Sequence, residues 1–461
     1  MKNANKTIII NILSTALLQG IYFLTIPIFT KVLGTAQYGM YSVFSSWSAI
    51  LTCIMGLGVG SALGSGQYYF KDSYYKFRSC LLLFGTIISF VMFAAGAVCS
   101  PFLSRITGYD SWLLCLLFIT AIGHYTVNFV QNACIYEKRA GMNMAVSLSL
   151  SAATVILSLF LISFFPDNGR FLGRVYGVGT AYLVMAVVLW IVTFFKEPVC
   201  LKKDFCKYGV LVGFPVVFHS LAHNILTQSD RVMMQYMNIS NEEIGIYSLY
   251  YTISSVMSTI LNALNISWCP FYYDDIDAKK WDALDRKCRN YIELFTVLTV
   301  GFLLLSREVS YILSDSEYWS GISIIPILVL AIYFTFMYQF PVNFEFFYRN
   351  TRIIATGTII AAFVNIGLNA VIIPVWGMYG AAIATAFSYG VLFVLHYFIV
   401  THMQKTPYHL SIRLFIPGFL IVCAFAAIFY LLADCWHIRW GIGLVIGIWE
   451  LRNIYHRKRI F

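Results

Sequence analysis

The sequence predicts an all-α membrane protein with about fourteen transmembrane helices, and no fewer than about twelve. Of its 461 residues, 59% are hydrophobic and only 11% are charged, whereas roughly a quarter of the residues in a soluble domain are charged. Apolar runs of about 20 residues, the length that a helix needs to cross a bilayer, recur along the whole chain. This composition excludes a soluble enzyme.

The apolar runs give the predicted spans in order. They are Thr7–Thr30, Tyr41–Leu63, Cys80–Ser100, Trp112–Asn132, Met144–Phe164, Val175–Phe195, Tyr208–Tyr236, Ile246–Ser267, Tyr291–Leu305, Ile322–Phe344, Ile353–Val375, Met378–Val400, Leu414–Leu432 and His437–Trp449. The last span is short, so counts of twelve and thirteen stay open. The first run has no charged residue and no small-x-small cleavage site after it, so we interpret it as a retained helix rather than a secretory signal.

Lysine and arginine are distributed unequally between alternate loops. With the N-terminus inside, most of the 31 basic residues lie in inner segments and Arg231 lies within a span. The outer segments hold only Lys31, Arg105, Arg170, Arg174, Arg307 and Arg439. Because basic residues collect on the cytoplasmic side, we predict an inner-membrane protein with both termini in the cytoplasm. The net charge of +10 is spread over many inner segments, which argues against nucleic-acid binding.

Two short motifs recur at nearly the same spacing. Gly39-Met-Tyr-Ser-Val is matched by Gly245-Ile-Tyr-Ser-Leu, and Tyr176-Gly-Val-Gly-Thr-Ala by Tyr379-Gly-Ala-Ala-Ile-Ala. The spacing predicts two parallel six-helix repeats, residues 1–200 and 201–405, which enclose a central cleft. Residues 406–461 form an additional helix pair with a basic cytoplasmic tail. Coincidence among helices rich in small residues is the alternative.

Charged side chains inside the predicted spans are candidate site residues, because a bilayer disfavours them. Asp230 and Arg231 are adjacent in the seventh span, and a structural charge pair is the alternative interpretation. His219 and His223 lie four residues apart on the same span and share a face, which is typical of a proton relay or a head-group site. Since no third ligand accompanies these histidines, we predict no metal site, and we predict no cofactor.

Polar uncharged side chains form a second group of candidates. In the fourth span His124, Asn128, Gln131 and Asn132 fall largely on one stripe. Amides in other spans extend the group: Asn11, Gln19, Asn262, Asn265, Gln339, Asn343, Asn365 and Asn369. Taken singly, each amide is explained by a hydrogen bond between helices. Together they predict an aqueous, uncharged-polar interior that suits the hydroxyls of a sugar.

Glycines in the second span suggest two different structures. Gly56, Gly60 and Gly64 recur every four residues, which predicts close packing along one helix face. A nucleotide-binding loop is the alternative, but no strand precedes these glycines and no Gly-Lys-Ser/Thr follows them.

Four stretches occur in a characteristic order along residues 5–400. They are Pro27 to Ser42, Ser229-Asp-Arg with Ile244-Gly-Ile-Tyr-Ser, Asn365 to Pro374, and Gly377-Met-Tyr-Gly-Ala-Ala-Ile-Ala-Thr. Together they resemble the polysaccharide-biosynthesis flippase family of the multidrug/oligosaccharidyl-lipid/polysaccharide exporter superfamily. The interior is poorer in arginine than that of the lipid II flippases of this superfamily, which disfavours that branch.

The resemblance implies a transporter rather than an enzyme. It would move undecaprenyl-diphosphate-linked oligosaccharide units from the cytoplasmic to the outer leaflet by alternating access, for O-antigen, capsule or exopolysaccharide assembly. The resemblance further implies a V-shaped central cleft and coupling to an ion gradient, with H⁺ and Na⁺ both open. Lys31 and Arg231 are the matching positions for the diphosphate, and Asp230 is the matching carboxylate for ion coupling. Membrane lipid, a polymerase and glycosyltransferases are the implied partners.

Two alternatives from other functional classes stay open. The first is a cation-coupled drug antiporter of the same superfamily, which is disfavoured because no carboxylate lies within a span of the first half. The second is a membrane enzyme that acts on polyprenyl-linked sugars. No outer loop is large and rich in Arg and His, as expected of a polymerase, which disfavours this alternative too.

Overall fold

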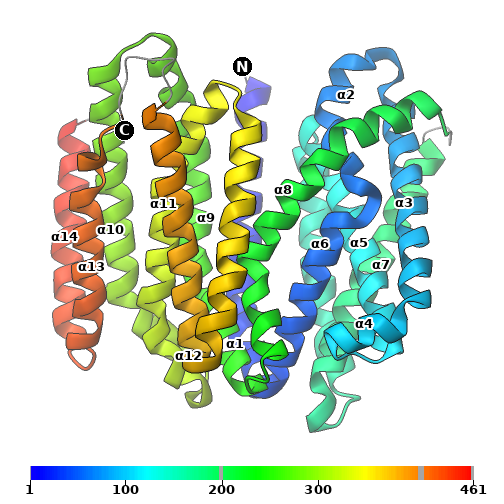
Figure 1. Ribbon diagram of the computed structural model, residues 1–461, viewed down its shortest axis with the longest axis horizontal. Helices are drawn as coiled ribbons and strands as arrows, with labels where there is room; N and C mark the ends of the chain where they lie inside the picture. Colours follow the sequence, from blue (N-terminus) through cyan, green and yellow to red (C-terminus); the bar gives the residue numbers. More distant parts are fainter. Residues whose placement is uncertain (1, 197–200, 403–409, 458–461) are drawn as a thin grey trace. The chain divides into compact units, whose positions relative to one another are not determined.

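The computed structural model describes residues 2–196, 201–402 and 410–457, except for the side chains of residues 2–19 and 22. In these ranges every regular element is an α-helix or a 3-10 helix, and ten helices are long and apolar enough to cross a membrane (Figure 1). Helices satisfy their own backbone hydrogen bonds, which lipid cannot do. The predicted all-α membrane fold is confirmed, whereas the count of fourteen spans and the two repeats stay predictions.

The chain divides into two compact units, which are described separately. The first comprises Met1–Tyr236 and Ser240–Glu242, and the second comprises Met237–Ile239 and Glu243–Phe461. The predicted segments 1–200, 201–405 and 406–461 are defined by the internal sequence repeat, whereas the two units are defined by contacts between residues. The three segments therefore stay a prediction. The basic tail from Lys458 onward lies outside the described residues.

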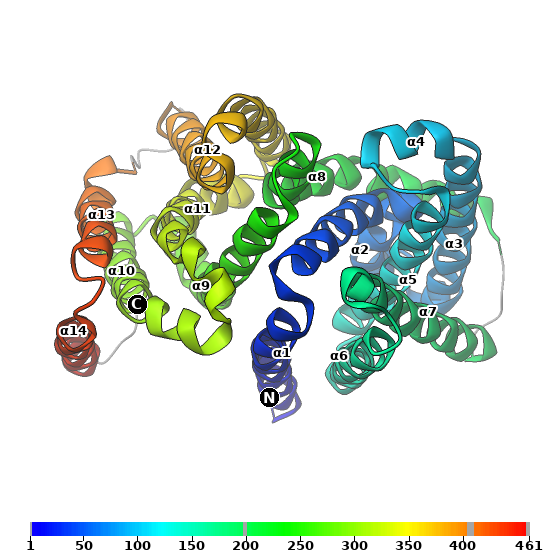
Figure 2. The same cartoon turned by 90° about the horizontal axis from the view of Figure 1, so that it is seen from below.

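The first unit contains eight α-helices and three 3-10 helices among the described residues. In order they are α1 (Lys2–Ile54), η1 (Met55–Ala62), α2 (Leu63–Tyr69), η2 (Lys71–Ser73), α3 (Tyr74–Val98), α4 (Ser100–Thr107), α5 (Ser111–Tyr136), α6 (Ala140–Ile162), η3 (Asp167–Gly169), α7 (Arg170–Lys196) and α8 (Lys203–Tyr236). The most buried of these spans is α5: 72% of its most apolar stretch is buried, against 28% in α3, α6 and α7. It is therefore the central helix of the unit (Figure 2).

The long helix α1 turns back at Gly34. This residue has φ 66° and ψ 176°, a backbone conformation that favours glycine because it has no Cβ. The turn lies in residues 31–40, between the first two predicted spans. A chain that crosses the membrane twice has to reverse its direction there.

The second predicted span ends differently from the prediction. Gly56, Leu57 and Gly58 all have positive φ, so the helix stops at Ile54 and a left-handed turn follows. The expected helical geometry is wrong at this point, but the expected close packing is present, because an added Cβ on Gly56, Gly60 or Gly64 would meet Tyr125, Phe129 or Tyr136 of α5. Gly58 also brings two backbones together, since a Cβ there would lie 2.7 Å from the carbonyl oxygen of Gly213 in α8.

The second unit continues the helical pattern. Its elements are α9 (Asn241–Asp277), α10 (Trp281–Leu313), η4 (Ser316–Ile324), α11 (Ile325–Phe347), α12 (Thr351–His402), η5 (Ile412–Leu414), α13 (Ile416–Leu431) and α14 (Trp436–Arg457). In the described part of this unit, three pairs of charged or titratable side chains join its helices. Asp275 of α9 meets Lys287 of α10, Glu345 of α11 meets His396 of α12, and Glu308 of α10 meets Arg439 of α14.

The helix α12 turns at Gly377, where φ is 51° and ψ is −128°. The carboxylate of Glu243, in α9, accepts a hydrogen bond from the backbone N–H of Met378 at 2.7 Å. A Cβ on Gly377 would collide with that carboxylate. Both the backbone angles and the space therefore require glycine at this turn.

Replacing Gly377 with alanine should lower the stability of the protein by about 1–3 kcal/mol, the usual cost of a strained backbone conformation. Gly367→Ala is the matched control in the same helix, because no atom of the described residues lies within 4 Å of a Cβ there. It should keep or raise the stability by about 1 kcal/mol, since alanine is the better helix former. Thermal unfolding of the purified full-length variants measures both effects, and equal midpoints would contradict the expectation.

Candidate functional site

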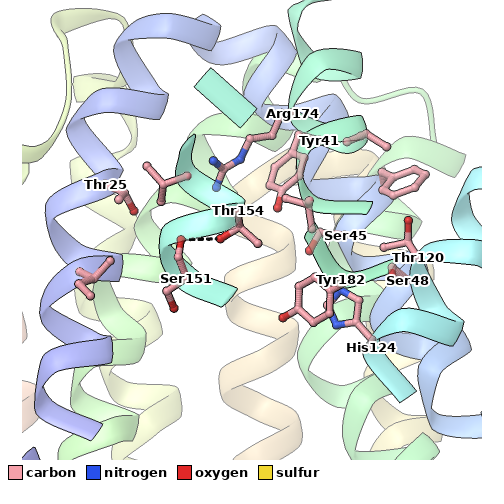
Figure 3. Close-up of a pocket in the computed structure, with 15 residues that line it drawn as sticks. Thr25, Tyr41, Ser45, Ser48, Thr120, His124, Ser151, Thr154, Arg174 and Tyr182 are labelled. Carbon is pink, nitrogen blue, oxygen red and sulfur yellow. Dashed lines mark hydrogen bonds between the residues drawn. The ribbon is translucent and has the colours of Figure 1, made fainter. Parts of the chain in front are cut away.

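Hydroxyl groups, a histidine and an arginine surround a cavity inside the first unit. The cavity has a volume of about 220 Å³ and lies between α1, α5, α6 and α7 (Figure 3). Its polar lining residues are Thr25, Tyr41, Ser45, Ser48, Thr120, His124, Ser151, Thr154, Arg174 and Tyr182. None of the 15 residues that line it is acidic. The cavity therefore carries a positive charge and no carboxylate in its lining.

Hydrogen bonds hold the start of α7 against the turn in α1. Nη1 of Arg170 donates to the carbonyl oxygen of Val32 at 3.0 Å. The backbone N–H of Phe171 donates to Oε1 of Gln37 at 3.1 Å. Arg174 follows Arg170 by about one helical turn. The turn in α1 thus fixes the position of Arg174 at one end of the cavity.

The guanidinium of Arg174 rests on aromatic rings. Its Cζ lies 3.2 Å from the ring centre of Phe29 and 5.0 Å from that of Tyr41, which are cation–π contacts. Nε and Nη1 are buried, and neither has a hydrogen-bond partner in the described part of the chain. A buried donor without an acceptor costs about 1–3 kcal/mol. Figure 3 shows the guanidinium pointing into the cavity near Thr154, where an acceptor on a ligand would satisfy it.

A stacked pair of rings lies at the other end of the cavity. His124 of α5 and Tyr182 of α7 have ring centres 3.6 Å apart and planes 11° apart (Figure 3). Two of the hydroxyls donate to carbonyls of their own helices: Thr120 at 2.7 Å and Thr154 at 2.8 Å. Their oxygens therefore present lone pairs that can accept hydrogen bonds from a ligand.

Comparison with known proteins gives the family. A protein-family model described as "Polysaccharide biosynthesis protein" matches residues 4–272, more than half of the chain. The chain belongs to this family. Among curated relatives, a protein of the Lsg locus of Haemophilus influenzae is 20% identical over 75% of this chain and 85% of its own length. An uncharacterized membrane protein of Methanocaldococcus jannaschii is 21% identical over 100% of this chain and 98% of its own length.

Solved structures place this member of the polysaccharide biosynthesis family among transporter folds. The lipid II flippase MurJ, in an inward closed conformation, has a TM-score of 0.75 at 16% identity, covering 97% of this chain and 99% of that one. An inward-facing multidrug resistance MATE family transporter of the MOP superfamily has a TM-score of 0.65 at 14% identity, covering 87% and 99%. At these identities the likeness shows the fold alone.

The predicted site residues of this family member are divided between the two units and differ in burial. His124 is the predicted residue that lines the cavity. Lys31, Asn128, Asn132 and His223 are exposed and His219 is half-buried, whereas Asp230, Arg231, Asn365 and Asn369 are buried. The side chains of Asn11 and Gln19 lie outside the described residues. The roles of the predicted residues stay predictions.

Three of the buried candidates contact neighbouring polar groups. Nη1 of Arg231 donates to Oε1 of Gln228 at 3.4 Å, and the same oxygen accepts from Ser46 of α1 at 3.1 Å. In the second unit, Nδ2 of Asn369 donates to Oδ1 of Asn365 at 3.1 Å. These bonds are of the kind that holds neighbouring helices or helical turns together.

Sequence reasoning missed Arg174, Tyr41 and Tyr182. Arg174 lies close to a predicted loop, so its place in the sequence puts it among the outer segments that indicate the orientation. One signal was available: Arg174 immediately precedes the apolar run from Val175 to Phe195, so it begins a span rather than lying free in a loop.

The cavity has the chemistry to hold one small anionic or polar group. A guanidinium offers a planar set of donors that matches phosphate and carboxylate, and the hydroxyl oxygens and stacked rings suit a sugar. At about 220 Å³, the cavity is smaller than the roughly 300–1,000 Å³ of drug-sized sites. It would therefore take one part of a larger substrate. Among the described residues no cluster of three or more His, Cys, Asp or Glu side chains could hold a metal ion.

Proposed function

We propose that the chain is a flippase for undecaprenyl-diphosphate-linked oligosaccharide repeat units. It would move them from the cytoplasmic to the outer leaflet of the bacterial inner membrane by alternating access. The units would feed assembly of a surface polysaccharide such as O-antigen, capsule or exopolysaccharide. Membership of the polysaccharide biosynthesis family and the fold shared with a lipid flippase support this proposal.

The observation that carries the proposal is the guanidinium of Arg174 in the hydroxyl-lined cavity. Two of its nitrogens are buried without an acceptor in the described part of the chain. A lipid-linked oligosaccharide carries both a diphosphate, which pairs with a guanidinium, and sugar hydroxyls, which pair with Ser and Thr oxygens. One phosphate or one sugar ring in the cavity would satisfy the donors of Arg174.

Other parts of the proposal extend beyond this cavity. Lys31 and Arg231 are proposed as further contacts for the diphosphate in a central V-shaped cleft, and Asp230 as the carboxylate for coupling to H⁺ or Na⁺. The amides and histidines of the spans would line the path of the sugars. A polymerase and glycosyltransferases would be the neighbouring partners, and both termini would lie in the cytoplasm.

A drug antiporter is the second candidate. The cavity lining has no acidic residue, so the cavity would repel a cationic drug rather than bind it. This observation favours the flippase over an antiporter of cations.

Loss of the protein should trap its substrate. We expect deletion of the gene to leave lipid-linked repeat units on the inner leaflet, so that an impermeant glycosidase added to spheroplasts no longer reaches them. The total pool of lipid-linked units should rise. Purified protein in liposomes should restore access of the glycosidase to labelled lipid-linked units, whereas liposomes without protein should not. Export of a cationic dye without movement of the lipid-linked units would contradict the flippase and favour the antiporter.

A further inference from the structure

A second polar pocket lies at the far end of α7 from the cavity. Its volume is about 370 Å³, and its charged and aromatic lining residues are Asp72, Tyr75, Lys76, Arg78, Arg139 and Lys196. They come from η2, the start of α3, the turn before α6 and the end of α7. Arg174 and Lys196 are separated by roughly 33 Å along α7, at 1.5 Å per residue. The pocket is therefore distinct from the cavity around Arg174.

One buried carboxylate organises two guanidinium groups in this pocket. Nη1 of Arg78 lies 2.6 Å from Oε1 of Glu137, and Nε of Arg139 lies 3.1 Å from Oε2 of the same residue. The side chains of Glu137 and Arg78 are only 5% and 11% exposed, whereas Arg139 is 42% exposed. Arg139 also donates to the hydroxyl of Tyr75 at 3.2 Å. The two guanidinium groups are thus held in defined positions before any ligand binds.

The pocket has more cations than anions. Glu137 neutralises one of the two guanidinium groups, and Lys76 and Lys196 outnumber Asp72 in the lining. The orientation of the protein in the membrane explains why basic residues lie at this end of the helices. Orientation needs only exposed charge, however, and it does not account for Arg78 being buried against Glu137. A cluster with excess positive charge and two positioned guanidinium groups is suited to bind an anion.

An apolar crevice continues from the pocket. It shares Arg78, Arg139 and Lys196 with the pocket and is otherwise lined mainly by apolar side chains of α3, α5 and α7, among them Leu82, Val130 and Val192; its volume is about 30 Å³. This combination of a charged pocket and an apolar crevice matches a molecule with an anionic head and a hydrocarbon tail.

The surrounding helix faces suit lipid. The ring centres of Phe90 in α3 and Trp190 in α7 lie 6.4 Å apart, so the two helices meet there. Phe90, Val91, Val187, Val188 and Ile191 of the same two helices are exposed, and such apolar faces pack against lipid tails. The pocket therefore lies where a lipid in the surrounding leaflet can reach it.

We propose that this pocket binds the phosphate of an anionic membrane phospholipid. Arg78, Arg139, Lys76 and Lys196 would hold the phosphate, and the first methylenes of an acyl chain would enter the crevice. The predicted cytoplasmic side of the protein agrees with this assignment, because anionic lipids attract basic residues there. The inference is independent of which substrate the protein transports.

Native mass spectrometry of the full-length protein, titrated with phosphatidylglycerol, tests the inference. Arg139→Gln combined with Lys196→Gln removes two charges of the pocket while leaving Arg78 paired with Glu137. We expect the affinity for phosphatidylglycerol to fall about 30-fold. Lys203→Gln combined with Lys207→Gln is the matched control: both residues are exposed at the start of α8 and neither lines the pocket. The affinity should fall much less than in the pocket variant, because salt screens exposed charges that lie outside the pocket.

A charge-preserving variant separates binding from folding. Arg139→Lys combined with Lys196→Arg should retain phosphatidylglycerol with an affinity close to that of the unmodified protein, and both pocket variants should unfold at a similar temperature. Binding of phosphatidylcholine with the same acyl chains as tightly as phosphatidylglycerol would overturn the proposal. An equal loss of affinity in the Lys203 and Lys207 control would also overturn it. Displacement of phosphatidylglycerol by stoichiometric undecaprenyl diphosphate would assign the pocket to the carrier lipid instead.

Discussion

Arg174→Gln is expected to lower the rate of flipping about 100-fold while leaving the protein folded. A charge-assisted hydrogen bond contributes about 1.5–3 kcal/mol, and two such bonds from the guanidinium to a phosphate would exceed the roughly 2.7 kcal/mol that a 100-fold change requires. The effect on stability should be small. The variant loses the cation–π contacts with Phe29 and Tyr41, about 0.5–2 kcal/mol. It also removes two buried donors that have no acceptor in the described part of the chain.

The measurement is the glycosidase-access assay in liposomes, together with the thermal midpoint of each variant. Arg105→Gln is the matched control, because Arg105 is an exposed arginine of α4 that does not line the cavity. Arg174→Lys should be intermediate, since lysine keeps the charge but loses the planar set of donors. Normal flipping by Arg174→Gln would remove Arg174 from the site. A variant that fails to fold would show that Arg174 acts through stability instead.

The spans could be predicted because the bilayer allows few structures. A chain in lipid has to satisfy its backbone hydrogen bonds internally, so apolar runs of sufficient length become helices. The turns at Gly34 and Gly377 also fall between predicted spans. The turn at residues 56–58 could not be predicted in the same way, because helix-spaced glycines suit both a packing face and a left-handed turn. Contact with Gly213, which is distant in the sequence, accompanies the turn.

The site was predicted less completely than the fold. By its spacing, the stripe on α5 puts His124, Asn128 and Asn132 on one side of the helix, but of these residues only His124 lines the cavity. Spacing shows which residues share a face, whereas the neighbouring helices decide which part of that face borders a cavity. Arg174 needs more than spacing, since its environment comes from Phe29 and Tyr41, which are distant in the sequence.

The second large effect is expected at the buried pair of Glu345 and His396. Both side chains are fully buried, with Oε2 and Nδ1 2.7 Å apart. The ring of Tyr338 packs against His396 with centres 5.1 Å apart. Within the described chain, Oε1 of Glu345 and Nε2 of His396 have no further partner. Each residue therefore depends on the other for its hydrogen bond.

Removing either partner should destabilise the protein by about 3–5 kcal/mol, because the remaining group would be left buried and unpaired. A hydrogen bond between membrane helices contributes only about 0.6 kcal/mol on average, since polar groups in the unfolded state also find partners in the membrane. The larger value applies here because protein rather than lipid surrounds both side chains, which are fully buried.

Glu345→Ala and His396→Ala should therefore lower the thermal midpoint sharply. His402→Ala, an exposed residue at the end of the same helix, should change the stability by no more than about 0.5 kcal/mol.

A double variant distinguishes a broken pair from lost volume. Glu345→Leu combined with His396→Phe replaces both groups with apolar side chains of similar size, and such replacements of buried pairs are often neutral or stabilising. Its thermal midpoint should therefore lie above that of either alanine variant. If the double variant were the least stable of the three, packing rather than the unpaired group would set the cost. The free energies of unfolding of both alanine variants could instead lie within about 0.5 kcal/mol of that of the unmodified protein. In that case the pair would contribute no more than an ordinary polar contact in lipid.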